Sequence, residues 1–264
     1  MTKDFSEAYC SLELLAKRLS AWVALSTREQ EMLLRKTRFF TSYEAGSTVP
    51  MPKDRDLRPT VIASGWACRE RITLSGRRQL LTILLPGDVI WGGGDEFPID
   101  LLETVAITKL RVVNLASVMR SFDPDPAGFA SLEYGLKMLQ LAEANDLVEH
   151  AVRLGARADQ RIAGLLLHLF ERCRTIGFVT GRSFVMPLKQ SYLGNLAGLS
   201  NVHVNRVLRQ FKAEGLIRLK SGIVEIIDWL GLASIEEGSG RREEWLPAHP
   251  RRHGDELECA IRAA

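Results

Sequence analysis

The residues best placed to do chemistry lie in one short segment, LSNVHVNRVLRQF, from Leu199 to Phe211. Its apolar residues recur at the spacing of an amphipathic helix, and long hydrogen-bonding side chains stand between them. These side chains belong to His203, Asn205, Arg206, Arg209 and Gln210. In the major groove of DNA, arginine pairs bidentately with guanine and asparagine with adenine. The segment therefore predicts a helix whose outer face reads base edges.

The preceding residues supply the elements that must position such a helix. An earlier helix would pack through Leu193, Leu196 and Ala197, and a tight turn follows at Gly198-Leu199-Ser200. Glycine permits the left-handed backbone that ends a helix, and serine can cap the next one. In the second helix, the residues expected to face inward are Val204, Val207, Leu208 and Phe211. The opposite side carries Asn201, Val202, His203, Asn205, Arg206 and Arg209. Turn, cap, periodicity and charge agree on a helix-turn-helix, against the alternative of an ordinary helical hairpin.

The flanks of this motif extend the expected binding surface. Lys189 and Gln190 stand at the start of the first helix, where contacts usually go to phosphate. The segment EGLIRLKSGIVEIID predicts a strand, a turn at Ser221-Gly222 and a second strand. Such a hairpin is a wing, with Arg218 and Lys220 near its tip.

The charge distribution agrees with a polyanionic partner. Residues 151–222 carry 12 Lys/Arg against 3 Asp/Glu, whereas residues 1–150 carry 18 against 20 and residues 223–264 carry 5 against 9. A basic segment between near-neutral and acidic ones is an electrostatic footprint for nucleic acid, although a solvated basic surface is the alternative.

The N-terminal half predicts a different architecture. Two short helices are expected within residues 7–37, the second capped by Ser26 with Glu29 as its capping-box partner. Short apolar runs separated by turn signals fill residues 38–115, with a hairpin at LSGRR and a strand–turn–strand at LLPGDVI. Strands at this spacing indicate a small β-barrel or sandwich.

A long helical pattern then runs to about Arg153. Spacings of four and three alternate along a seam made by Tyr134, Met138, Leu141, Asn145, Val148 and Val152. This heptad pattern favours a helix–helix pair, in which Asn145 would fix the register of a dimer. The alternative is one amphipathic helix packed on its own domain.

Several classes of protein are disfavoured. The four cysteines, Cys10, Cys68, Cys173 and Cys259, have no metal-type or redox-type spacing, so a reducing cytoplasmic setting is expected. No apolar run approaches the roughly 18 residues of a membrane helix, and the N-terminus is not a signal peptide. No nucleophile–base pair, metal-ligand spacing or phosphate-cradling loop indicates an enzyme.

The order of these elements resembles the catabolite-activator/fumarate–nitrate regulator (Crp/Fnr) family of bacterial transcription factors. The likeness rests on LLPGDVI, on RIAGLLLHLFER and above all on LKQSYLGNLAGLSNVHVNRVLRQFKAEGLI, and it covers about residues 10–235. It implies an α+β fold with a cyclic-nucleotide-binding-like sensor barrel of the jelly-roll type. The expected domains are the sensor (1–121), a dimerisation helix (122–153), a winged helix-turn-helix (154–235) and a disordered tail (236–264).

The resemblance also implies roles for single residues. Val202, Asn205 and Arg206 occupy the family's base-reading positions, and Ser200 and Gln190 occupy positions that touch phosphate. Many members have glutamate where Val202 stands, and valine cannot accept a hydrogen bond from cytosine. The preferred half-site is therefore expected to differ from that of better-known members.

The sensor shows no match to the ligands of known members. An anion pocket needs a cation or converging N–H donors, yet residues 79–108 contain no Lys or Arg, and Asp100 falls near the family's phosphate arginine. Gly92, Gly93 and Gly94 could form a backbone nest, but a flexible turn is the simpler interpretation. The N-terminal part has too few cysteines for an iron–sulfur cluster. A haem needs an axial ligand, and no histidine precedes His150, which leaves Cys68 or an N-terminal donor as the alternative to a simple buried thiol. Neither a cyclic nucleotide nor an iron–sulfur cluster is expected, and the effector stays unknown.

The function expected is a Crp/Fnr-type regulator that binds a palindromic promoter site as a homodimer and touches RNA polymerase. The alternative is an effector-binding signalling protein whose winged helix mediates protein contacts. DNA binding should weaken steeply with salt, which separates the two.

Overall fold

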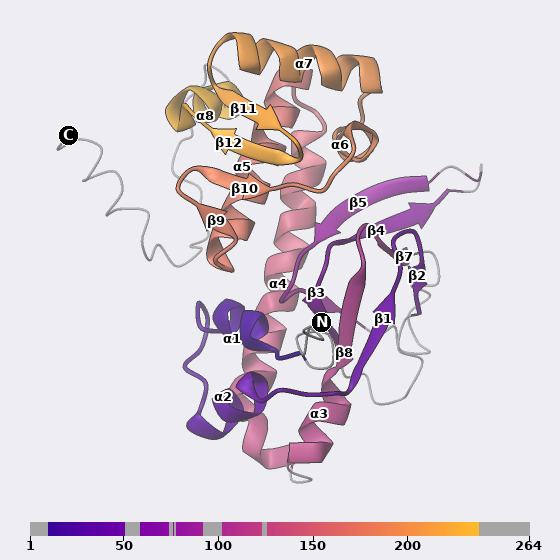
Figure 1. The fold of residues 1–264 in the computed structure, drawn as a ribbon, viewed down its shortest axis with the longest axis vertical. Coiled ribbons are helices and arrows are strands. Elements are labelled where there is room, and N and C mark those ends of the chain that lie inside the picture. Colours follow the sequence, from indigo (N-terminus) through magenta and orange to yellow (C-terminus); the bar gives the residue numbers. More distant parts are fainter. Residues whose placement is uncertain are drawn as a thin grey trace, which may run out of the picture.

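The N-terminal half is a two-layer β-structure. The computed structural model describes residues 10–50, 59–73, 76, 78–91, 102–122 and 126–237 of the chain. Within these residues, eight strands form two antiparallel four-stranded sheets, ordered β1-β8-β3-β6 and β2-β7-β4-β5. The strands are β1 (Phe40–Tyr43), β2 (Thr48–Val49), β3 (Thr60–Ser64), β4 (Ala67–Ile72), β5 (Arg78–Leu84), β6 (Val89–Ile90), β7 (Leu102–Ala106) and β8 (Leu110–Asn114). This arrangement confirms the expected jelly-roll type of fold, shown in Figure 1.

Short apolar runs produce this fold because alternate residues of each strand face the space between the sheets. The buried cluster there consists of Val49, Ile62, Ala67, Leu84, Ile90, Ala106, Leu110 and Val112. The hairpin β4–β5 and the strand–turn–strand β5–β6 lie where LSGRR and LLPGDVI predicted them. Gly87 in the second turn has a φ of +88°, and a Cβ there would stand 2.8 Å from the carbonyl oxygen of Leu14.

Helices cover one end and one side of this β-structure. They are α1 (Glu13–Leu19), α2 (Thr27–Leu34), α3 (Leu115–Phe122), the 3-10 turn η2 (Pro126–Phe129) and α4 (Ala130–Arg153). Helix α3 was not predicted from the sequence. Asn114 begins it by accepting a hydrogen bond from the Ser117 N–H at 3.0 Å, a local capping signal that was available in the sequence.

Helix α4 runs along the molecule (Figure 1), and its two sides differ in burial. Leu132, Leu136 and Leu139 are buried in a cluster with α1, α2 and α3. Tyr134, Leu141, Val148 and Val152 of the heptad seam are 53–69% exposed. The helix therefore packs on its own domain through one row and leaves a second apolar row uncovered.

The N-terminus of α4 is capped by a residue from another helix. Glu29 forms the expected capping box with Ser26 at the start of α2. Its second carboxylate oxygen accepts a hydrogen bond from the Leu132 N–H at 2.7 Å. The N-cap residue of α4 is Phe129, whose side chain has no hydrogen-bond acceptor. The buried Glu29 therefore caps two helices at once.

Replacing Glu29 with alanine is expected to lower the free energy of unfolding by about 2–3 kcal/mol, because buried donors in two helices lose a charged acceptor. Burial opposes ionisation of Glu29, but hydrogen bonds from Ser26, Leu132 and Ser131 outweigh it and lower the pKa of the carboxyl. Its contribution is therefore present above the unfolded pKa of about 4.3 and is lost as pH falls through the lower folded pKa. Urea unfolding at neutral and acidic pH checks both statements. The exposed Glu31 of α2 provides the control, and an equal loss for Glu31→Ala would contradict the capping role.

An ion-pair network centred on the buried Asp88 joins three elements near the β5–β6 turn. Asp88 forms ion pairs with Arg18 of α1 and with Arg172 of the helix α5 (Ala158–Thr175), and it accepts a hydrogen bond from the Leu85 N–H at 2.6 Å. Burial, and then the like charge of Arg172, lower the pKa of the Arg18 guanidinium. Asp88 thus offsets the cost of holding two cations close together away from water.

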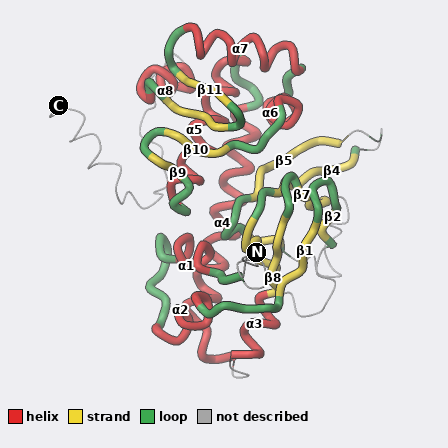
Figure 2. The backbone as a smooth tube through the Cα atoms, in the orientation of Figure 1, coloured by secondary structure: helices red, strands yellow, loops and turns green. Residues whose placement is uncertain are grey.

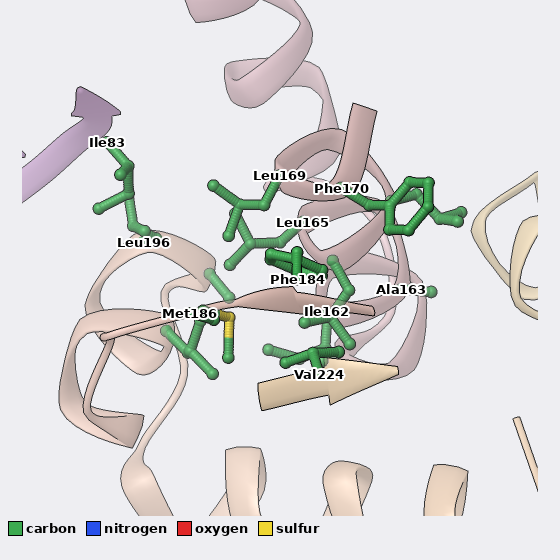
Figure 3. Packing of buried hydrophobic residues seen from close by; sticks show 14 of the residues in the cluster. Ile83, Ile162, Ala163, Leu165, Leu169, Phe170, Phe184, Met186, Leu196 and Val224 are labelled. Atoms are coloured by element: carbon green, nitrogen blue, oxygen red, sulfur yellow. The ribbon is translucent and has the colours of Figure 1, made fainter. Parts of the chain in front are cut away.

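The C-terminal part is a helical domain with a four-stranded sheet, ordered β11-β12-β10-β9. After α5 come β9 (Val179–Thr180), β10 (Ser183–Val185), α6 (Gln190–Ala197), α7 (Asn201–Ala213), β11 (Ile217–Lys220), β12 (Ile223–Ile226) and α8 (Trp229–Glu237). Figure 2 shows the helices around this sheet, and Figure 3 shows Ile162 and Leu165 of α5 facing Phe184 of β10 and Val224 of β12.

The elements α5, α6, α7 and the β11–β12 wing were predicted from the sequence, but β9, β10 and α8 were not. The two missed strands have only two and three residues, too short for a periodic signal. Helix α8 begins after Asp228, whose carboxylate accepts a hydrogen bond from the Gly231 N–H at 2.9 Å. It includes Glu236 and Glu237, and the rest of the expected tail lies outside the described residues.

Candidate DNA interface

The turn between α6 and α7 has the geometry that its sequence predicts. Gly198 adopts the left-handed conformation, with φ of +62°, and ends α6. Ser200 begins α7, where its hydroxyl oxygen accepts a hydrogen bond from the His203 N–H at 3.3 Å. The inward residues Val204, Val207, Leu208 and Phe211 are all buried. The two helices therefore form one packed unit.

The outer face of α7 displays most of the side chains expected to meet DNA. Asn201, Val202, His203, Arg206 and Arg209 are exposed, and Asn205 is half-buried. Val202 is 78% exposed, although it is apolar. Within the described residues, the side chains of Arg206 and Arg209 make no ion pair or hydrogen bond. Both guanidinium groups are thus available to a partner.

His203 differs from its neighbours on this face. Its Nδ1 lies 2.9 Å from the Ser200 hydroxyl oxygen, so the ring is tied to the cap of its own helix. Lys189 is the N-cap residue of α6 and Gln190 its first residue, and both are exposed. Their place at the start of α6 agrees with contacts to phosphate.

The wing is the β11–β12 hairpin, which pairs with β10 through β12. Lys220 ends β11 beside the turn, whose Ser221 has a positive φ of +49°. Arg218 lies two residues before the strand end and forms an ion pair with Glu225, its direct cross-strand neighbour. Lys220 is therefore nearer to the tip, and Arg218 is partly neutralised.

These parts lie at one end of the molecule, with α7 at the top of the view and α2 and α3 at the opposite end (Figure 1). A capped helix with exposed arginines, a supporting helix and a β-wing define the class of winged helix-turn-helix DNA-binding domains.

Known proteins agree with this class. Residues 160–235 match the family model of the Crp-like helix-turn-helix domain. The chain is 29% identical over 164 residues to the transcriptional regulatory protein Btr of Bordetella pertussis, covering 61% of this chain and 66% of that protein. It is 26% identical over 174 residues to the transcriptional activator FnrA of Stutzerimonas stutzeri, covering 64% and 68%. It thus spans about two thirds of the length of these curated relatives.

About three quarters of the chain also has solved counterparts. FixK2 from Bradyrhizobium japonicum superposes with a TM-score of 0.60 at 20% identity, over 75% of this chain and 96% of that one. A Crp/Fnr-family regulator from Thermus thermophilus gives 0.51 at 22% identity, over 76% and 100%. Residues 160–235 thus match a Crp-like helix-turn-helix domain, and the chain shares its fold with a solved Crp/Fnr-family regulator.

Proposed function

We propose that the chain is a Crp/Fnr-type transcription regulator, which binds a two-fold-symmetric DNA site as a homodimer in the cytoplasm and acts on RNA polymerase from that site. The observation that carries the proposal is the outer face of α7, where exposed arginines and polar side chains project from a rigid helix. In the described part of the chain, no helix is long and apolar enough to cross a membrane. The residues proposed to contact DNA are those expected from the sequence: Lys189, Gln190, Ser200, Asn201, Val202, His203, Asn205, Arg206, Arg209, Arg218 and Lys220.

The homodimer is supported by the uncovered seam of α4. Leu141, Val148 and Val152 are large, apolar and more than half exposed, at heptad spacing on one side of a 24-residue helix. Such a row is covered most simply by the same row of a second copy. The half-buried Asn145 on the seam would set the register of the pair.

Replacing Leu141 with glutamate is expected to convert the dimer into a monomer, because a carboxylate on each chain would enter the apolar seam. Sedimentation at micromolar concentration measures the change in mass. Gln140→Glu adds the same charge to an exposed position that faces away from the seam and should stay dimeric. A dimeric Leu141→Glu protein would contradict the proposed interface.

The base-reading residues suggest a particular half-site. Arg206 would pair with guanine and Asn205 with adenine. The exposed methyl groups of Val202 suit the C5-methyl group of thymine, whereas a glutamate there would accept a hydrogen bond from cytosine. We therefore propose thymine at the base pair that Val202 meets.

The sensor is proposed not to bind a cyclic nucleotide. The space between the sheets is filled by apolar side chains. Between the β-structure and α4, Glu143 pairs with Arg69 and accepts a hydrogen bond from the Trp91 indole N–H at 2.7 Å. Among the described residues, the cavity left beside them measures about 20 Å³, room for one water molecule. Small-ligand pockets are typically about 300–1,000 Å³. Residues 92–101, which include the possible glycine nest and Asp100, lie outside the described residues.

Selection from random duplex DNA by the purified protein, with no ligand added, tests the proposal. The expected product is a two-fold-symmetric site with half-sites about one helical turn apart. Its affinity should fall steeply as salt rises, which a protein-contact role for the winged helix would not produce. If no sequence were enriched and the protein bound all duplexes alike in a salt-sensitive way, recognition of a specific site without an effector would be contradicted.

A further inference from the structure

Strand β5 is an edge strand, and its outer edge is covered by the DNA-binding domain. In the sheet order β2-β7-β4-β5, β4 is the only strand among the described residues that pairs with β5. Exposed strand edges present unpaired N–H and C=O groups, which proteins usually cover or block. Here the cover comes from side chains of α5 and α6, more than 85 positions further along the chain.

Asn195 of α6 makes the central contact. Its amide nitrogen donates to the carbonyl oxygen of Arg78 at 3.2 Å, and its amide oxygen accepts from the Leu80 N–H at 3.1 Å. The Gln79 side chain returns a hydrogen bond to the Asn195 carbonyl oxygen at 3.2 Å. The carboxamide thus gives β5 the donor and the acceptor that a neighbouring strand would provide.

Further contacts extend the junction between β5 and the DNA-binding domain along the strand. Arg172 of α5 donates to the Ile83 carbonyl oxygen at 2.7 Å while it pairs with Asp88. Ile83 points toward Leu196 of α6 (Figure 3), and both belong to one hydrophobic cluster that spans the sensor and the DNA-binding domain. The two domains are therefore held together by apolar packing as well as by hydrogen bonds.

The consequence concerns the orientation of α7. Helices α6 and α7 form one unit, in which the Leu199 N–H donates to the Gly194 carbonyl oxygen at 2.8 Å. Holding α6 on β5 therefore also sets the direction of α7 relative to α4, the proposed dimer helix. The outer face of α7 stays exposed while this contact is made, so the contact is compatible with DNA binding.

We propose that Asn195 is a positioning residue, which locks the helix-turn-helix onto β5 and thereby pre-orients the two recognition helices of a dimer without an effector. This inference rests on the proposed function. Pre-orientation matters only when both recognition helices must fit one rigid site, because a single half-site accepts any relative orientation of the two.

The test compares wild type, Asn195→Ala, Asn195→Asp and Gln79→Ala on the selected palindrome and on a duplex with one half-site. Asn195→Ala is expected to bind the palindrome about tenfold more weakly, the equivalent of one or two net hydrogen bonds. On the half-site its affinity should match that of wild type. Asn195→Asp keeps the acceptor for the Leu80 N–H, so its affinity for the palindrome should lie between those of wild type and Asn195→Ala. Because Gln79 lies in the sensor, Gln79→Ala should weaken binding to the palindrome and leave binding to the half-site unchanged.

Two further measurements separate the outcomes. Hydrogen exchange at β5 should become faster in Asn195→Ala, which shows that the contact has opened. Thr175→Ala is the control, because that exposed hydroxyl donates to the Glu171 carbonyl oxygen within its own helix at 3.0 Å. Equal palindrome affinities of wild type and Asn195→Ala, or a tighter variant, would overturn the positioning role. Failure of wild type to bind any selected duplex would overturn the proposed function itself.

Discussion

Replacing Arg206 with alanine is expected to abolish sequence-specific DNA binding. Arg206 is exposed on α7, one turn beyond Val202, and makes no ion pair or hydrogen bond within the described residues. A bidentate arginine–guanine contact contributes about 1–3 kcal/mol of discrimination, and a dimer makes the contact twice. The expected loss is therefore about 2–6 kcal/mol in binding to the palindrome, with general DNA binding retained. Titration of the selected site and of a scrambled duplex measures both.

Lys189→Ala provides the matched contrast for Arg206→Ala. A phosphate contact carries no sequence information, so its loss should weaken binding to all duplexes alike and reduce the salt slope by about one. If Arg206→Ala bound the palindrome as tightly as wild type, the register of the recognition helix would be wrong.

Replacing Asp88 with alanine is expected to destabilise the protein by about 3–5 kcal/mol, because two partly buried arginines lose their shared, buried counter-ion. Arg18 and Arg172 both lie within ion-pair distance of its carboxylate, and the side chain of Asp88 is 5% exposed. Asp88→Asn retains the size and one acceptor, so a similar loss in that variant would assign the effect to charge. Urea unfolding gives both values.

The control for Asp88 is an exposed ion pair. Glu171 pairs with Arg174 within α5, and both side chains are more than 40% exposed. Glu171→Ala should cost about 0–1 kcal/mol, because water screens the pair. Comparable losses for Asp88→Ala and Glu171→Ala would show that burial of the Asp88 network is not what stabilises the junction.

Much of the DNA-binding end could be predicted from the sequence, because its signals are local. Gly198 and Ser200 end one helix and begin the next through bonds that span three or four residues. Periodicity then decides which side of α7 is buried. The same holds for the capping box of Ser26 and for the exposed heptad seam of α4. Short strands such as β9 and β10 could not be predicted, because two or three residues carry no period.

The sequence by itself thus determined the order of the main elements, the place of α7 and the side of α7 that faces outward. Only the tertiary structure decided which residues from distant parts of the chain lie in contact. The bonds from Glu29 to Leu132, from Arg172 to Ile83 and from Asn195 to Leu80 cross 103, 89 and 115 positions of the chain. In the sequence, Asn195 is a polar residue within a helix and Glu29 is the partner in a cap. Each gains its second role because folding brings an unpaired backbone group beside it, and no local pattern encodes that distant group.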